Sequence, residues 1–138
     1  MTQYGIKLLW AGWKDDNVIG FSHRGYKRWS DEIKLGTRML LYETSIKRPG
    51  TTSKGTRSII GEVEVSGSFE DGEKYRAPSE QHDHLVPVKV LRPRREGKRI
   101  PLDRIRELIN DASWPRQGET WKPLNREVYD LLCAELEK

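Results

Sequence analysis

Several aromatic side chains stand outside the apolar stripes that strands and helices bury. The chain has five Trp and five Tyr but only two Phe. Trp and Tyr combine a flat stacking face with a hydrogen-bonding edge, which suits recognition of a nucleobase. Five aromatic residues lie among polar or small neighbours: Trp13, Phe21, Tyr75, Trp114 and Trp121. We expect part of this set to face a ligand, whereas apolar periodicity places Trp10 and Trp29 in the core.

Positive charge is concentrated in two segments. Residues 22–57 hold nine Lys and Arg against three acids, and residues 89–106 hold eight against two, although the whole chain is only +4. Residues 62–83 and 107–138 are net acidic. Two basic segments that meet in the fold would line a groove for a polyanion. The alternative is that they are solvated faces and hairpin tips.

The residue types that catalysis requires do not form a familiar constellation. The chain contains neither GxxxxGK[ST] nor GxSxG, which are the signatures of a phosphate loop and a hydrolase elbow. His82 and His84 could share one face of a strand, but Asp83 between them would point away from a common metal. Cys133 has no cationic neighbour that would activate its thiol. We therefore expect no metal, no cofactor and no enzyme activity.

Size and composition favour one domain over residues 1–138. A single cysteine excludes an intramolecular disulfide, which is typical of a reducing compartment. No apolar run approaches the ~18–20 residues that cross a bilayer. We expect a cytoplasmic protein without membrane attachment.

Hydrophobic periodicity predicts the elements that would position these residues. Strands are expected over residues 4–10, 38–44, 57–67 and 84–93, the third with a bulge or close backbone approach at Gly61. Tyr26, Trp29 and Ile33 have helical spacing, with a helix C-cap at Gly36. Two further helices follow, one over residues 100–110 and one starting at Asn125. Few helices and several strands favour a small, mostly antiparallel barrel with helices outside it.

The motifs within these elements resemble the EVE domain of the PUA-like superfamily, which also contains the YTH and ASCH domains. The best markers are IKLGTRMLLYE (residues 33–43) and the IIGEVEV that follows it (residues 59–65). LVPVKVLRP, PLDRIREL and RQGETWKPLNREVYDLLCAEL extend the resemblance over nearly the whole chain. It implies an α+β fold, a PUA-like small mixed β-barrel of five or six strands flanked by helices, with a pocket on one side.

The resemblance also implies a binding site. EVE and YTH domains are thought to bind modified bases, the YTH domains in a cage of aromatic side chains. The family's usual Trp after the first strand is absent, and Phe21 is its expected substitute. The expected base-pocket residues are Ile19, Gly20, Phe21, Ser22, Tyr42, Glu43, Tyr75, His82, Trp114, Gln117 and Trp121. The expected phosphate-binding residues are Arg24, Lys27, Arg28, Lys47, Arg48, Lys54, Arg57, Arg94, Arg95 and Lys98.

These observations predict a nucleic-acid-binding module that recognises a modified base by flipping it into an aromatic-lined pocket. It would act as a stand-alone reader or as the specificity domain of a modification-dependent restriction system. Modified DNA is favoured over RNA as the partner, and the chain is expected to be a monomer. The sequence leaves open whether the chain acts with a protein partner or a fused nuclease.

Two other functions remain as alternatives. The first is an ASCH-like RNA-binding protein or amidohydrolase acting on modified nucleosides, with Lys34, Thr37 and Glu43 as its cluster; the spacing departs from the ASCH motif. The second is a protein-interaction module that uses the acidic segment 62–83.

Overall fold

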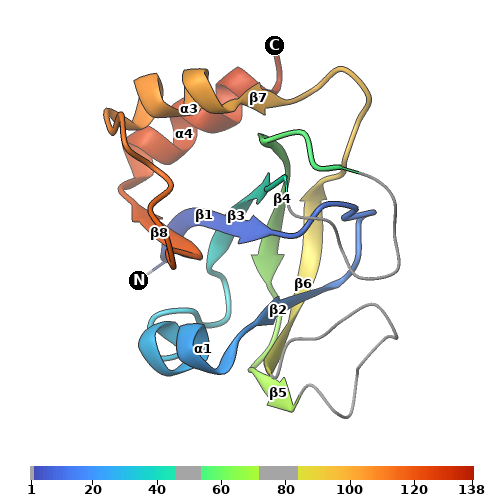
Figure 1. Ribbon diagram of the computed structural model, residues 1–138. Coiled ribbons are helices and arrows are strands. Elements are labelled where there is room, and N and C mark those ends of the chain that lie inside the picture. The colour runs from blue at the N-terminus through green and yellow to red at the C-terminus, as the bar shows by residue number, and fades with distance from the viewer. Residues whose placement is uncertain (1, 46–53, 72–83) are drawn as a thin grey trace.

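One curved, mixed β-sheet organises the protein. The computed structural model describes residues 2–45, 54–71 and 84–138 (Figure 1). Six strands pair in the order β2–β6–β4–β3–β1–β8, with β1 and β3 parallel and the other neighbours antiparallel. The strands of this path are β1 (Tyr4–Leu9), β2 (Val18–Phe21), β3 (Arg38–Glu43), β4 (Ser58–Val65), β6 (His84–Arg92) and β8 (Trp121–Leu124). Short strands β5 (Glu70–Asp71) and β7 (Ile100–Pro101) pair with β6 and β4.

Three helices flank this sheet in the described ranges. They are α1 (His23–Trp29), α3 (Leu102–Ile109) and α4 (Arg126–Leu136). Figure 1 shows α3 and α4 together at one end of the sheet and α1 at the other. The α+β class and the mixed barrel of five or six strands flanked by helices are confirmed, and the barrel is a half-barrel that ends at β2 and β8. None of these helices is long and apolar enough to cross a bilayer.

Side-chain caps fix the starts of two helices. The Ser22 hydroxyl accepts a hydrogen bond from the Gly25 N–H (3.1 Å), so α1 begins at His23. The Asn125 side chain accepts one from the Val128 N–H (2.9 Å), which confirms the predicted cap of α4. The first helix is shorter than its apolar spacing predicted, because Ser30 and the acid after it favour a turn over a helix interior.

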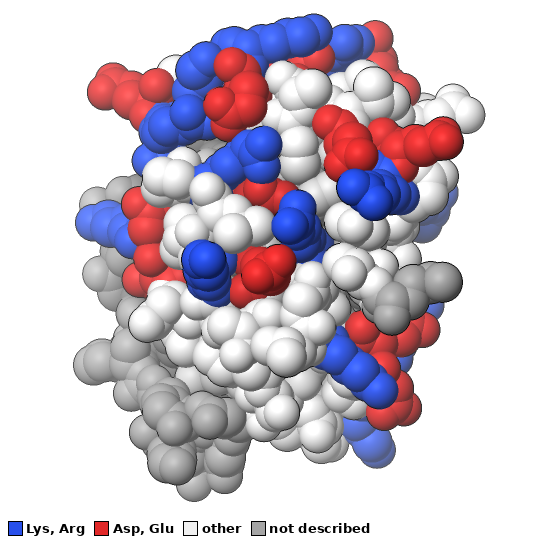
Figure 2. Space-filling view, turned by 180° about the vertical axis from the view of Figure 1, so that it is seen from behind, with Lys and Arg blue, Asp and Glu red and all other residues white. Residues whose placement is uncertain are grey.

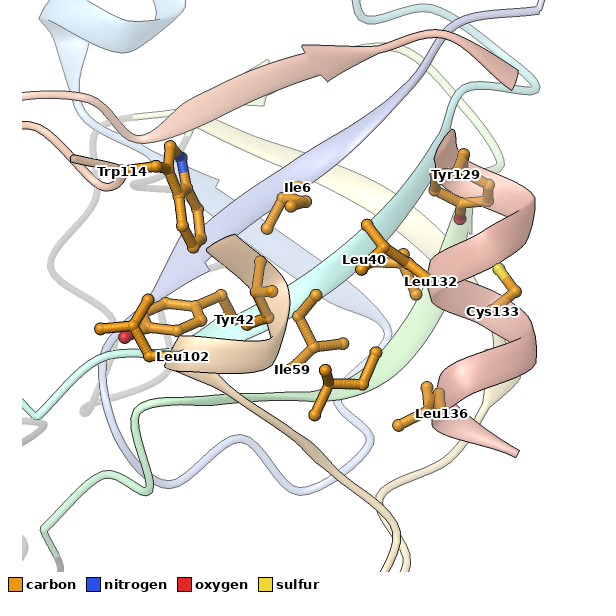
Figure 3. Close-up of a cluster of buried hydrophobic side chains, with 12 residues drawn as sticks. Ile6, Leu40, Tyr42, Ile59, Leu102, Trp114, Tyr129, Leu132, Cys133 and Leu136 are labelled. Carbon is orange, nitrogen blue, oxygen red and sulfur yellow. The ribbon is translucent and has the colours of Figure 1, made fainter. Parts of the chain in front are cut away.

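Strand β3 separates two hydrophobic clusters, as alternation of side chains across a strand requires. Leu40 and Tyr42 face a cluster that α3 and α4 cover, with Trp114 at its edge (Figure 3). Met39 and Leu41 face the second cluster, which includes Phe21. Strand β3 is therefore covered on both faces.

Gly61 on β4 permits a close backbone approach. A Cβ atom at this position would lie 2.6 Å from the indole of Trp13 and 2.8 Å from the Arg92 carbonyl oxygen. The register shifts between Leu41 and Tyr42, which leaves Ile60 as an extra residue on β4. The close backbone approach, one of the two alternatives predicted at Gly61, is confirmed, and the bulge lies beside it at Ile60. Trp13 is buried because it fills the space over this glycine.

Candidate nucleic-acid interface

A cavity opens between the end of β1, the start of α1 and the loop before β8. Its volume is about 360 Å³, within the ~300–1,000 Å³ of small-molecule sites. Backbone hydrogen bonds join its walls. The Leu8 N–H donates to the Thr120 carbonyl oxygen, and the Thr44 N–H donates to the Leu9 carbonyl oxygen, each at 2.9 Å. The lining residues of this cavity, called here the Trp10 cavity, are Lys7, Leu8, Leu9, Trp10, Ser22, Thr44 and residues 115–120.

Trp10 is the aromatic side chain of this cavity. Strand β1 ends at Leu9, so Trp10 no longer follows the alternation that buries Ile6. Trp10 is half-buried and belongs to neither hydrophobic cluster. The core position expected for Trp10 is therefore wrong. Ala11 and Gly12 directly after it are the sequence signal that the strand stops there.

Lys7 places a buried ammonium group at the cavity wall. Its exposed fraction is only 2%. The Nζ atom donates to the Leu8 carbonyl oxygen (2.8 Å) and lies 4.5 Å from the ring centroid of Phe21. The carbonyl oxygen and the face of the aromatic ring both carry partial negative charge, so both contacts stabilise the ammonium group.

A basic groove adjoins the cavity. It measures about 370 Å³ and shares the turn 116–119 with the Trp10 cavity. Gly118 has φ +81° at the tip of this turn, which favours glycine. The groove, called here the Arg24 groove, is lined by Arg24, Arg28, Trp29, Trp121, Pro123, Lys122 and residues 116–119. One turn therefore separates a site of nucleobase size from a surface with four cations.

Intramolecular acids neutralise only part of this charge. Arg116 donates two hydrogen bonds to Asp111 (2.9 and 3.0 Å), and they hold the pKa of that carboxyl down to about 2. Lys122 Nζ lies 3.6 Å from the same carboxylate. Arg28 lies over the Trp29 ring, 4.8 Å from its centroid. Within the described part of the chain, no carboxylate forms an ion pair with Arg24 or Arg28, so both can meet an external anion.

Comparison with known proteins identifies the fold. No protein-family model and no curated protein matches the chain. Human THYN1, in complex with DNA containing 5-methylcytosine, is 17% identical with a TM-score of 0.63, covering 99% of this chain and 98% of that one. Rpa0253 from Rhodopseudomonas palustris is 14% identical with a TM-score of 0.61, and the match covers 98% of this chain and 93% of that one. The Pho92 YTH domain in complex with m6A is 10% identical with a TM-score of 0.63, and the match covers 99% of this chain and 87% of that one.

The chain has the PUA-like fold. EVE-like proteins and YTH domains share it. The EVE-domain resemblance found in the sequence is thereby confirmed at the level of the fold.

The PUA-like fold brings only part of the expected base pocket together. Ser22 and Gln117 line the Trp10 cavity, and Trp121 reaches the edge of the Arg24 groove while staying 98% buried. Five residues expected in the pocket are core residues instead: Ile19, Gly20, Phe21, Tyr42 and Trp114. Tyr42 and Trp114 pack edge to face with ring centroids 5.1 Å apart (Figure 3). Tyr75 and His82 lie outside the described residues.

Glu43, another expected base contact, holds the backbone. Its buried carboxylate accepts hydrogen bonds from the N–H groups of Gly12 and Thr56 (both 2.9 Å) and from Arg94 (2.5 and 3.1 Å). Burial alone would raise the pKa of Glu43, but these hydrogen bonds outweigh burial and lower it below its ordinary value. The structure therefore gives Glu43 a structural role.

Only one end of the first basic segment lies beside the second. Residues 22–28 lie near the first residue of β6, about 26 Å from its last residue, Arg92, at ~3.3 Å per residue. At the other end, Thr56 and Arg94 bind the same Glu43 carboxylate. Three expected phosphate contacts in this second segment bind the protein itself. Arg94 pairs with Glu43, Arg95 pairs with Glu137 (2.6 Å), and Lys98 donates to the carbonyl of Glu137 (2.9 Å).

The remaining expected phosphate contacts are divided. Arg24 and Arg28 line the groove, and Lys27 is exposed on α1 between them. Lys54 and Arg57 are exposed elsewhere, and Lys47 and Arg48 lie outside the described residues. Figure 2 shows the face opposite that of Figure 1, where Lys and Arg atoms gather along the top with acidic atoms against them, and uncharged residues cover the lower middle. Sequence analysis missed Arg116 and Lys122, because their segment is net acidic.

His84 contacts a residue that sequence spacing did not indicate. Its Nε2 lies 3.0 Å from His23 Nδ1, and its ring stacks on Tyr26 with centroids 3.8 Å apart. In the described ranges no three His, Cys, Asp or Glu residues are placed to hold a metal ion. The histidine pair instead joins the start of α1 to the start of β6.

Proposed function

We propose that the protein binds nucleic acid containing a modified base, with the base in the Trp10 cavity and the flanking phosphates in the Arg24 groove. The observation that carries the proposal is the position of turn 116–119, which forms a wall of both sites. A flipped base is joined to its own phosphates, so its pocket must lie beside a cationic surface.

The energies of base flipping fit this arrangement. Extruding a base costs a few kcal/mol, and stacking on one aromatic ring returns ~1–3 kcal/mol. Trp10 is the aromatic residue that lines the cavity, and Ser22, Thr44 and Gln117 are polar residues of its lining. A single ring barely balances the cost, so phosphate contacts must supply the rest of the affinity. Arg24 and Arg28 are the principal candidates for those contacts.

Relatives of the same fold support a modified base as the ligand class. Human THYN1 was solved with DNA containing 5-methylcytosine and the Pho92 YTH domain with m6A. Of the two polymers we propose DNA, because the THYN1 match spans nearly all of both chains. In a modification-dependent restriction system this chain would supply recognition and a nuclease partner would supply cleavage.

Catalysis is not part of the proposal. Thr37 directly precedes β3 and Glu43 ends it, about 20 Å away at ~3.3 Å per residue. The Thr37 hydroxyl accepts a hydrogen bond from the Lys34 N–H (3.0 Å), and the Glu43 carboxylate binds Arg94. The three residues considered for an amidohydrolase therefore do not form one cluster.

Fluorescence anisotropy with labelled oligonucleotides tests the proposal. The oligonucleotides differ only at one central position, which carries cytosine, 5-methylcytosine, adenine or N6-methyladenine, each in DNA and in RNA. Burying one methyl group is worth ~0.8 kcal/mol, so we expect one modified base to bind about fourfold or more tighter than its plain parent. Equal affinity for every modified and plain pair would refute the proposal.

A further inference from the structure

The Arg24 groove contains more than a phosphate surface requires. Phosphates need cations and hydrogen-bond donors, yet this groove is also lined by two indoles and a proline: Trp29, Trp121 and Pro123. Its volume of about 370 Å³ is close to the 360 Å³ of the Trp10 cavity. The groove therefore has room for a nucleotide with its base as well as for a phosphate.

Arg28 and Trp29 form a stacking surface on the wall of this groove. The guanidinium carbon of Arg28 lies over the Trp29 ring, 4.8 Å from its centroid. Trp29 packs against the second hydrophobic cluster, while Arg28 is exposed on α1. A guanidinium is planar, so a ring beneath one of its faces leaves the other face for a second flat group. Nucleobases stack on arginine in this way as they do on aromatic rings.

Continuity with the Trp10 cavity indicates which base would use this surface. Turn 116–119 is a wall of both sites, and adjacent bases of one strand are joined through a single phosphate. A strand whose modified base occupies the cavity can therefore cross this turn and place its next nucleotide in the groove. Arg24 in the same groove has the charge to bind the phosphate of that nucleotide.

We propose that the base next to the modified one stacks on the Arg28 guanidinium in the Arg24 groove, an inference that rests on the proposed function. The ligand is then a segment with two adjacent unpaired nucleotides, one base in each site. Affinity depends on this second base as well as on the modified one, and Arg28 has a role beyond its charge.

Abasic sites separate the base contact from the phosphate contact, because they remove a base and keep its phosphate. Single-stranded DNA carries 5-methylcytosine or N6-methyladenine, whichever the wild type binds more tightly, and its plain parent strand is titrated alongside. One abasic site is placed at the 5′ neighbour of the modified base, at its 3′ neighbour or several positions away. Each strand is titrated with the wild type, with Arg28→Lys, which keeps the charge but has no planar group, and with Arg24→Lys, the matched control in the same groove.

In the wild type, an abasic site at one of the two neighbours should weaken binding about fivefold or more, the effect of one stacked base at ~1–3 kcal/mol. The distant abasic site should have no effect. In Arg28→Lys the loss at that neighbour should shrink to less than about twofold, whereas Arg24→Lys should retain it. The salt dependence of binding should be the same in all three proteins, because both variants keep the positive charge.

The outcomes separate this inference from the function it rests on. A preference for the modified base without a loss at either neighbour would overturn the inference alone. A wild-type loss that persists in Arg28→Lys would also refute it, because another group would then contact the second base. Equal affinity for the modified strand and its plain parent would overturn the proposed function, and the inference with it.

Discussion

Arg94 forms a two-pronged ion pair with Glu43, a residue 51 positions earlier in the chain. Its two terminal nitrogens lie 2.5 and 3.1 Å from the carboxylate oxygens. The same carboxylate accepts the N–H groups of Gly12 and Thr56. One buried side chain thereby ties together the segment after β1, the end of β3, the start of β4 and the turn after β6. Two of these segments, through Trp10 and Thr44, form walls of the cavity.

Replacing Glu43 should destabilise the whole protein. Glu43→Gln keeps the shape of the side chain but leaves Arg94 without its counter-ion and replaces one acceptor oxygen with a donor. We expect a loss of about 2–4 kcal/mol in the free energy of unfolding by urea titration, since breaking one side of a buried pair is costly. Glu64→Gln, whose pair with Arg38 is exposed, is the control and should cost less than ~1 kcal/mol. Similar losses in the two variants would contradict the buried role.

The same group should shape the pH dependence of stability. The pKa of Glu43 is lower in the folded protein than its ordinary value, so its contribution is present above that value and is lost as pH falls through the folded pKa. The free energy of unfolding of the wild type should therefore fall below about pH 4.5. Glu43→Gln should fall less steeply over the same range, and a parallel fall in both proteins would argue against it.

Phe21 and Trp121 should behave as core residues. Both are at most 2% exposed and belong to the second hydrophobic cluster. Phe21→Ala and Trp121→Ala should each cost about 3–5 kcal/mol of stability, measured by denaturant unfolding. Leu131→Ala, on an exposed site of α4, should stay within ~0.5 kcal/mol. Loss of selective binding at unchanged stability would instead restore Phe21 as the cavity wall.

Periodic patterns predicted most of the fold because they are local. The alternation along β6 and the cap at Asn125 are properties of a few neighbouring residues, and both are found where they were expected. The stripe of Tyr26 and Trp29 predicted a helix, but its length depended on the turn-forming residues that follow. Local patterns therefore located elements better than they located their ends.

The site was harder to predict because its residues meet only through tertiary structure. Alternation along the strand predicted that Trp10 is buried in the core. Strand β1 ends at Leu9, however, so Trp10 lies one residue beyond it and lines the cavity instead. Burial of Trp114 depends on how the loop before β8 packs against Tyr42, which no local pattern records. The charge of residues 92–99 indicated a phosphate surface, but acids distant in sequence neutralise much of it.

The Arg24 groove should determine the salt dependence of binding. Substituting Arg24 and Arg28 together with Gln should reduce the slope of log K against log salt by about two units, roughly one per lost phosphate contact. The control substitutes Lys89 and Arg99 with Gln, two exposed cations in the other basic segment, and should leave the slope unchanged. Equal changes in both variants would show that the groove has no special role.

The most direct test of the base in the cavity is the affinity ratio between methylated and plain DNA in Trp10→Ala. Trp29→Ala is its matched control, because Trp29 lines the Arg24 groove and not the cavity. We predict that Trp10→Ala binds the methylated strand about tenfold or more weakly than the wild type and brings the ratio close to one, with melting temperature checked in parallel. Trp29→Ala should weaken both strands equally and keep the ratio. A folded Trp10→Ala protein that retains the wild-type ratio would contradict the account.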